Sequence, residues 1–155
     1  MNGKKSGSDL LVQLAPIALI GFIGFKLYDK FFGDPNADKV KLTVDQVKTE
    51  IQKKEDAGEL PTFTQTQYNT FADTLSAAME GMGTDETTIY RVMAKMTTLL
   101  DVMKLVSAFG VRTYHEFLWI EEQYNLGQWF QNELGASEMK KLNKILSDKK
   151  INFQF

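Results

Sequence analysis

Apolar residues recur at the spacing of an α-helix through most of the chain after residue 60. The clearest stripe follows i, i+3, i+4 and i+7 spacing and consists of Tyr68, Phe71, Ala72, Leu75 and Met79. Thr64 and Gln67 precede it as a capping box, the reciprocal side-chain pair that begins many helices. The pattern therefore predicts an amphipathic helix with one buried face.

The same period continues toward the C-terminus. Further stripes are formed by Ile89, Val92, Met93 and Met96, by Leu99, Met103, Val106 and Phe109, and by Met139, Leu142, Ile145 and Leu146. Between them, Thr113 and Glu116 predict the cap of a helical segment that Gly135 closes. No pair of strands is evident, so the predicted fold class is all-α. The tail "INFQF" alternates apolar and polar residues, which favours an extended clasp.

A shorter amphipathic helix is predicted at residues 43–57. Thr43 and Gln46 form its capping box, and Gly58 ends it. Its apolar face consists of Val44, Val47 and Ile51. The predicted organisation is a tail and anchor at 1–28, a neck containing this helix at 29–62, and a compact helical domain with its tail at 63–155.

The stretch "LLVQLAPIALIGFIGF", residues 10–25, is uncharged and mostly apolar. With the residues that follow, it approaches the roughly 20 residues that cross a bilayer as a helix. A cleaved signal peptide and a buried core helix are the alternatives, but bulky and charged residues follow the stretch instead of a small-residue cleavage site. We therefore expect one transmembrane anchor, and representative residues of the span are Leu10, Leu14, Pro16, Ile20, Phe22 and Phe25.

Composition excludes several classes of function. The 18 basic and 20 acidic residues nearly balance and form no basic cluster, so nucleic acid is not an expected partner. The chain has no cysteine and a single histidine, His115, which excludes thiolate and histidine-rich metal sites. It also has no phosphate-binding glycine motif and no nucleophile–base pair. We expect a protein that is not an enzyme and has no catalytic residues.

The loop "GMGTDE", Gly81 to Glu86, allows two interpretations. In the first it is a helix connection, in which Gly81 adopts a left-handed conformation, Thr84 caps the next helix and the acids occupy its first turn. In the second, the two glycines let backbone carbonyls face outward, where they suit a hard cation such as calcium once a carboxylate joins them.

Residues 73–93, "DTLSAAMEGMGTDETTIYRVM", resemble an annexin repeat, and so do "SAFG" at 107–110 and "WFQNELGASEMKKL" at 129–142. The resemblance covers about half the chain, residues 66–148, and implies a five-helix repeat. It also implies a calcium ion held by the carbonyls of Met82, Gly83 and Thr84 and by the acid Glu133, with the ion bridging to anionic phospholipid. By distance from the loop along the chain, Glu121 or Glu122 is the alternative acid.

Annexins combine four repeats, whereas this chain has room for one, so we expect another copy or another protein subunit to cover part of its apolar surface. Candidate contacts are Trp119, Tyr124, Trp129, Phe130, Phe153 and Phe155, for which core packing is the alternative. The resulting hypothesis is a non-enzymatic, single-pass, multi-copy structural protein that tethers a helical domain at a bilayer. A membrane-containing virion or a cell envelope would suit it. The alternative is a calcium-dependent module that binds anionic phospholipid.

Overall fold

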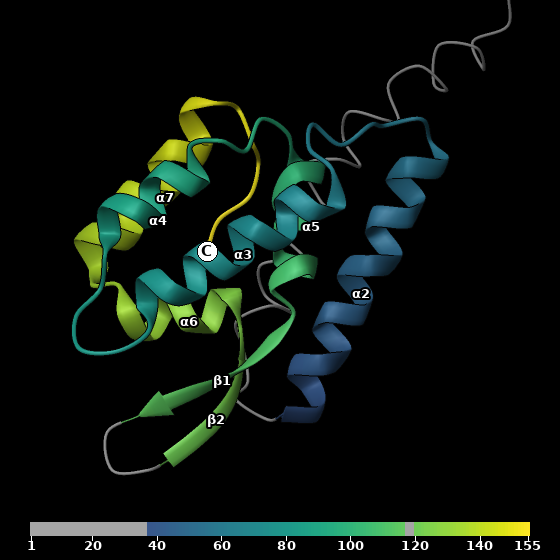
Figure 1. Ribbon diagram of the computed structural model, residues 1–155. Helices are drawn as coiled ribbons and strands as arrows, with labels where there is room; N and C mark the ends of the chain where they lie inside the picture. The colour runs from purple at the N-terminus through teal and green to yellow at the C-terminus, as the bar shows by residue number, and fades with distance from the viewer. Residues whose placement is uncertain (1–36, 117–119) are drawn as a thin grey trace, which may run out of the picture.

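The computed structural model describes residues 37–116 and 120–155 (Figure 1). The elements in chain order are α2 (Ala37–Asp56), α3 (Gln65–Met79), α4 (Glu86–Met93), α5 (Leu99–Phe109), β1 (Val111–Glu116), β2 (Ile120–Asn125), α6 (Leu126–Glu133) and α7 (Ala136–Asp148). The predicted helical character is confirmed for this part of the chain, where six of the eight elements are helices. An antiparallel hairpin, β1–β2, is the exception.

One hydrophobic cluster joins the helices. α3 packs against α4 and α5, α4 packs against α7, and α2 packs against α5 (Figure 1). Fully buried side chains such as Leu75 on α3, Leu105 on α5 and Leu142 on α7 meet in this cluster. The predicted capping box of Thr64 and Gln67 is present, and Gly110 ends α5 as expected. Helical periodicity therefore located the core faces correctly.

The helix before residue 60 is longer than predicted and belongs to the folded domain. α2 begins at Ala37, so Thr43 lies inside the helix and does not cap it. No glycine or proline interrupts residues 37–43, and a helix propagates readily through such a sequence. Val47 and Ile51 are buried in the common core, and Lys104 of α5 forms an ion pair with Glu55 at 2.6 Å. The residues predicted as a neck thus contribute a packed helix.

Residues 111–116 and 120–125 pair as antiparallel strands where the sequence predicted a helix. Val111 pairs with Asn125 and Glu116 with Ile120, and Gly110 enters β1 with φ +64°. β-branched and aromatic residues such as Val111, Thr113 and Tyr124 favour paired strands, and packing against α2 and α6 reinforces that preference. Thr113 and Glu116 therefore do not cap a helix.

Arg112 attaches the start of the hairpin to the helices. Its Nε donates to the carbonyl of Phe109 at 3.1 Å, and one terminal nitrogen reaches the carboxylate of Asp73 on α3 at 2.8 Å. The guanidinium also lies 4.7 Å from the centre of the Phe109 ring. These contacts fix where the first strand leaves the end of α5.

The carboxylate of Asp101, in the first turn of α5, is fully buried and joins three segments. Tyr68 of α3 donates its hydroxyl at 2.6 Å, and the backbone N–H groups of Thr62 and Thr97 donate at 2.9 Å each. Burial by itself would raise the pKa of Asp101, but these hydrogen bonds outweigh it and hold the pKa below its usual range. Burial and the bond to Asp101 raise the pKa of Tyr68 well above its ordinary value.

The C-terminal tail closes over the core with the predicted alternation. Ile151, Phe153 and Phe155 are buried, whereas the two polar residues between them are exposed. Asn143 of α7 bonds to the backbone of Phe155 through both its amide nitrogen, at 2.9 Å, and its amide oxygen, at 2.8 Å. The Phe155 ring meets Phe130 edge to face at 4.9 Å. The tail therefore covers apolar surface of α6 and α7.

None of the helices in the described ranges is both long enough and apolar enough to span a membrane. The predicted span at 10–25 lies outside those ranges.

Candidate functional site

The loop between α3 and α4 carries the first part of the candidate site. Gly81 and Gly83 have φ +100° and +92°, which L-residues with side chains rarely adopt, and the N–H of Asp85 closes the loop on the carbonyl of Ala78 at 2.8 Å. Met82, between the glycines, is fully exposed, with a relative accessibility of 106%. The loop thus presents an apolar side chain to solvent from a closed backbone turn.

Asp85, and not Thr84, caps α4. Its carboxylate accepts the backbone N–H of Thr88 at 2.9 Å and the Thr88 hydroxyl at 2.6 Å. These hydrogen bonds from Thr88 lower the pKa of Asp85. Thr84, which the sequence predicted as the cap, is therefore available for another contact.

Thr84 donates its hydroxyl to Oε2 of Glu133 at 2.5 Å. Glu133 is the last residue of α6, and its Oε1 accepts the hydroxyl of Tyr114 from β1 at 2.7 Å. The loop, the hairpin and the end of α6 thus converge on one carboxylate. Of the acids considered from the sequence, Glu133 is the one that lies against the loop.

Glu121 and Glu122 occupy β2, where Glu121 pairs across the hairpin with His115. The Glu121 carboxylate lies 3.8 Å from Nδ1 of His115, and both side chains are largely exposed. Neither acid lines the cavity beside the loop. Distance along the chain from the loop favoured Glu121 and Glu122 because it took no account of strands β1 and β2, which lie between α5 and α6 in the sequence.

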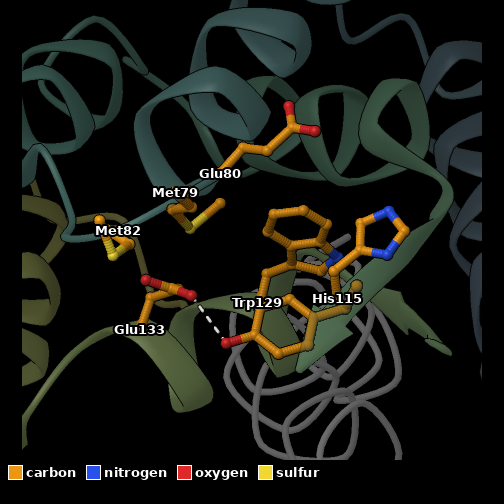
Figure 2. A pocket seen from close by; sticks show the side chains of 8 residues that line it. Met79, Glu80, Met82, His115, Trp129 and Glu133 are labelled. Atoms are coloured by element: carbon orange, nitrogen blue, oxygen red, sulfur yellow. Dashed lines mark hydrogen bonds between the residues drawn. The ribbon is translucent and has the colours of Figure 1, made fainter. Parts of the chain in front are cut away.

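A cavity of about 680 Å³ adjoins Glu133 (Figure 2). Its lining residues come from the end of α3, the loop, β1 and α6, and are Met79, Glu80, Gly81, Met82, Tyr114, His115, Trp129 and Glu133. Two of them are carboxylates and none is Lys or Arg. In the view of Figure 2, Glu80 lies above the Trp129 ring and Glu133 lies to its lower left. The lining chemistry favours a cation over an anion.

The aromatic residues predicted as partner contacts lie in the interior. Tyr124, Trp129, Phe130, Phe153 and Phe155 are each at most 8% exposed, and Trp119 lies outside the described residues. Trp129 packs edge to face on Phe109 and on Tyr114, with ring centres 5.6 and 5.0 Å apart. Its Nε1–H is buried without a hydrogen-bond partner. Core packing, the alternative considered from the sequence, accounts for these five side chains.

The sequence patterns did not identify Tyr114 or Glu80 as residues of the site, and they singled out His115 only as the one histidine of the chain. Tyr114 was assigned to a helical segment, where its hydroxyl had no predicted target. Enrichment of β-branched and aromatic residues over 111–114 was the available signal for a strand. That signal is too short to outweigh the helical pattern on either side.

Chemically, the site offers oxygen donors. No group of three or more His, Cys, Asp or Glu side chains suited to a metal ion occurs among the described residues. Any ion held here would therefore depend on at most two side-chain carboxylates together with backbone, hydroxyl and solvent oxygens. Comparison with protein-family models, with curated proteins and with solved structures returned no match.

Proposed function

We propose that the chain is a non-enzymatic, membrane-associated module resembling one annexin repeat, in which calcium held between the Gly81–Glu86 loop and Glu133 contacts anionic phospholipid. The observation that carries the proposal is the hydrogen bond from Thr84 to Glu133, which joins residues 49 positions apart. It unites the loop and the acid that the resemblance implied.

The charge of Glu133 supports a cation at this place. Glu133 ends α6, where the helix dipole is negative and disfavours a carboxylate. None of the ion pairs among the described residues includes it, and its hydrogen-bond donors are two neutral hydroxyls. A half-buried carboxylate in such a position gains from a positive ligand.

The donor chemistry fits calcium. Calcium takes six to eight oxygen ligands, and the residues that would supply them here are Glu133, Thr84 and the backbone carbonyls near Met82 and Gly83. Water and a phospholipid phosphate would complete the shell. So few protein ligands suit a weak site, with a dissociation constant on the order of 10⁻⁴ to 10⁻³ M, as in extracellular calcium modules.

Met82 supports contact with a lipid surface. Its fully exposed side chain lies in the loop that would hold the ion, so an apolar group and a cation would meet the membrane together. A chain already anchored through residues 10–25 gains little from binding the same bilayer again. The proposed contact therefore acts on a second, opposed membrane.

The test uses the full chain reconstituted into vesicles, mixed with acceptor vesicles containing phosphatidylserine. Calcium in the millimolar range should cluster the two populations, as measured by light scattering, and calorimetry on the detergent-solubilised chain should show saturable binding. Glu133→Gln should weaken calcium binding by about tenfold or more, because it removes the charged ligand. Glu122→Gln on the hairpin is the matched control and should behave like the parent protein.

Absence of calcium binding up to 10 mM (a limit set above the estimated range of affinities) would reject the calcium proposal. Equal losses in both variants would also reject it, because they would indicate an effect of net charge alone.

A second candidate is a multi-copy structural protein that links a bilayer to other protein subunits, as in a membrane-containing virion or a cell envelope. The uncharged stretch at 10–25 favours it. Native mass measurement of the chain extracted from its membrane tests this candidate. A defined assembly of several copies would support it, and a monomer at all concentrations would argue against it.

A further inference from the structure

Tyr114 approaches Glu133 from outside the helices that carry the loop and the acid. Its hydroxyl donates to Oε1 at 2.7 Å, while Thr84 donates to Oε2, so each carboxylate oxygen has its own donor. A glutamate side chain has three rotatable bonds, and one hydrogen bond would leave the second oxygen free to swing. The pair of donors fixes the plane of the carboxylate.

The Tyr114 ring is itself held by aromatic neighbours. It meets Trp129 edge to face at 5.0 Å and lies 5.4 Å from the Tyr124 ring across the hairpin. Trp129 in turn packs on Phe109 at the end of α5. This series of rings connects the hydroxyl to the hydrophobic core, so its position does not depend on the exposed part of the hairpin.

The hairpin is fixed on its other side as well. Both strands pack against α2, and β2 packs against α6, the helix that ends at Glu133 (Figure 1). A donor on β1 is therefore carried by a hairpin whose two strands together contact two helices of the domain. Tyr114 is also one of the residues that line the cavity beside the carboxylate.

We propose that Tyr114 is a positioning residue for the cation site: its hydroxyl orients the Glu133 carboxylate toward the loop before the ion arrives. This inference rests on the proposed function. It assigns to the hairpin a part in binding, because the hairpin supplies a donor that the loop and α6 do not. Preorganisation of this kind raises affinity by removing the entropic cost of ordering the ligand side chain.

Tyr114→Phe retains the ring and removes only the hydroxyl. In the detergent-solubilised full chain, calorimetry with calcium chloride should show binding weakened about three- to tenfold, the range expected when one side chain must be ordered on binding. Tyr124→Phe makes the same change on the partner strand of the hairpin and should leave the affinity unaltered. Thermal unfolding of both variants verifies that they remain folded.

A spectroscopic measurement separates positioning from general stability. With ¹³C at the ζ carbon of tyrosine, the resonance missing from Tyr114→Phe identifies Tyr114 in the parent protein. The chemical shift of this resonance should change during the calcium titration, with the same midpoint as the heat of binding measured by calorimetry. The change is expected because the bound ion compensates the negative charge of Glu133, which accepts the hydrogen bond from Tyr114. In Glu133→Gln the Tyr114 resonance should not respond to calcium.

The outcomes distinguish the two proposals. If the parent protein binds calcium and Tyr114→Phe binds it equally well, with no shift at Tyr114, the positioning role is wrong and the proposed function stands. If the parent protein does not bind calcium in these titrations, the proposed function fails and the role of Tyr114 fails with it. If calcium binding is weaker in Tyr114→Phe but not in Tyr124→Phe, and the Tyr114 resonance shifts in the parent protein, both proposals are supported.

Discussion

Asp101 and Glu133 are both carboxylates held by hydroxyl groups, yet they differ in burial, in number of donors and in place on a helix. Asp101 lies in the first turn of α5, fully buried, and accepts hydrogen bonds from Thr62, Tyr68, Thr97 and Thr98. Glu133 lies at the last residue of α6, half-buried, and accepts the hydroxyls of Thr84 and Tyr114.

These differences indicate that Asp101 is a structural carboxylate, whereas Glu133 can bind a ligand. The helix dipole favours an acid at the start of α5 and disfavours one at the end of α6. Asp101 has its charge compensated by many donors, with no solvent access, so it has no capacity for a further partner. Glu133 faces a cavity and retains capacity for one.

The largest effect is expected from Asp101→Asn. The amide cannot accept all the hydrogen bonds that the carboxylate accepts, and buried donors from three segments lose their partner. We expect the free energy of unfolding to fall by about 3 kcal/mol or more, measured by urea denaturation. Lys48→Met, which breaks an exposed ion pair with Asp45, is the control. It should change the free energy of unfolding by less than about 1 kcal/mol.

Acid should destabilise the protein partly through Asp101. Because its pKa is lower in the folded protein than the ordinary value of 3.8, the unfolded chain binds a proton first as pH falls. Its contribution to stability is therefore complete above about pH 5 and is lost progressively below that. Thermal unfolding from pH 6 to pH 2 should show a shallower fall in Asp101→Asn than in the parent protein. Parallel curves would contradict this assignment.

Glu133→Gln should have little effect on folding. The amide oxygen still accepts one hydroxyl, and loss of a negative charge at the end of α6 removes an unfavourable interaction with the dipole. We expect the free energy of unfolding to change by at most about 1 kcal/mol in urea, in either direction. A loss as large as that predicted for Asp101→Asn would show that Glu133 is also structural.

The smallest effect is expected from Met82→Ser. Because Met82 is fully exposed, its removal should leave both the stability and the calcium affinity in solution unchanged. Clustering of phosphatidylserine vesicles should weaken by about three- to tenfold, since one partly inserted side chain contributes about 1 kcal/mol. Leu60→Ser is the matched control and should not weaken clustering, because Leu60 is the other large apolar residue that is exposed in the described part of the chain.

Periodicity was sufficient for the helices and most of the core. The stripes on α3, α5 and α7 face inward as predicted, and the capping box of Thr64 begins α3. Local sequence patterns placed the start of two helices at the wrong residue. Thr43 and Gln46 matched a helix start, yet α2 continues N-terminal to them, and Thr84 matched a cap that Asp85 provides. Short capping signals indicate a helix more reliably than they indicate its first residue.

The sequence by itself determined the helical periods, the glycine turn at 81–83 and the alternation of the tail, because these follow from backbone preferences and from the spacing of apolar residues. Only the tertiary structure decided that residues 111–116 and 120–125 pair as strands and that Glu133, not Glu121 or Glu122, meets the loop. Both depend on contacts between residues far apart in the chain. Strand pairing and a shared carboxylate are set by packing on α2 and α6, which no local pattern encodes.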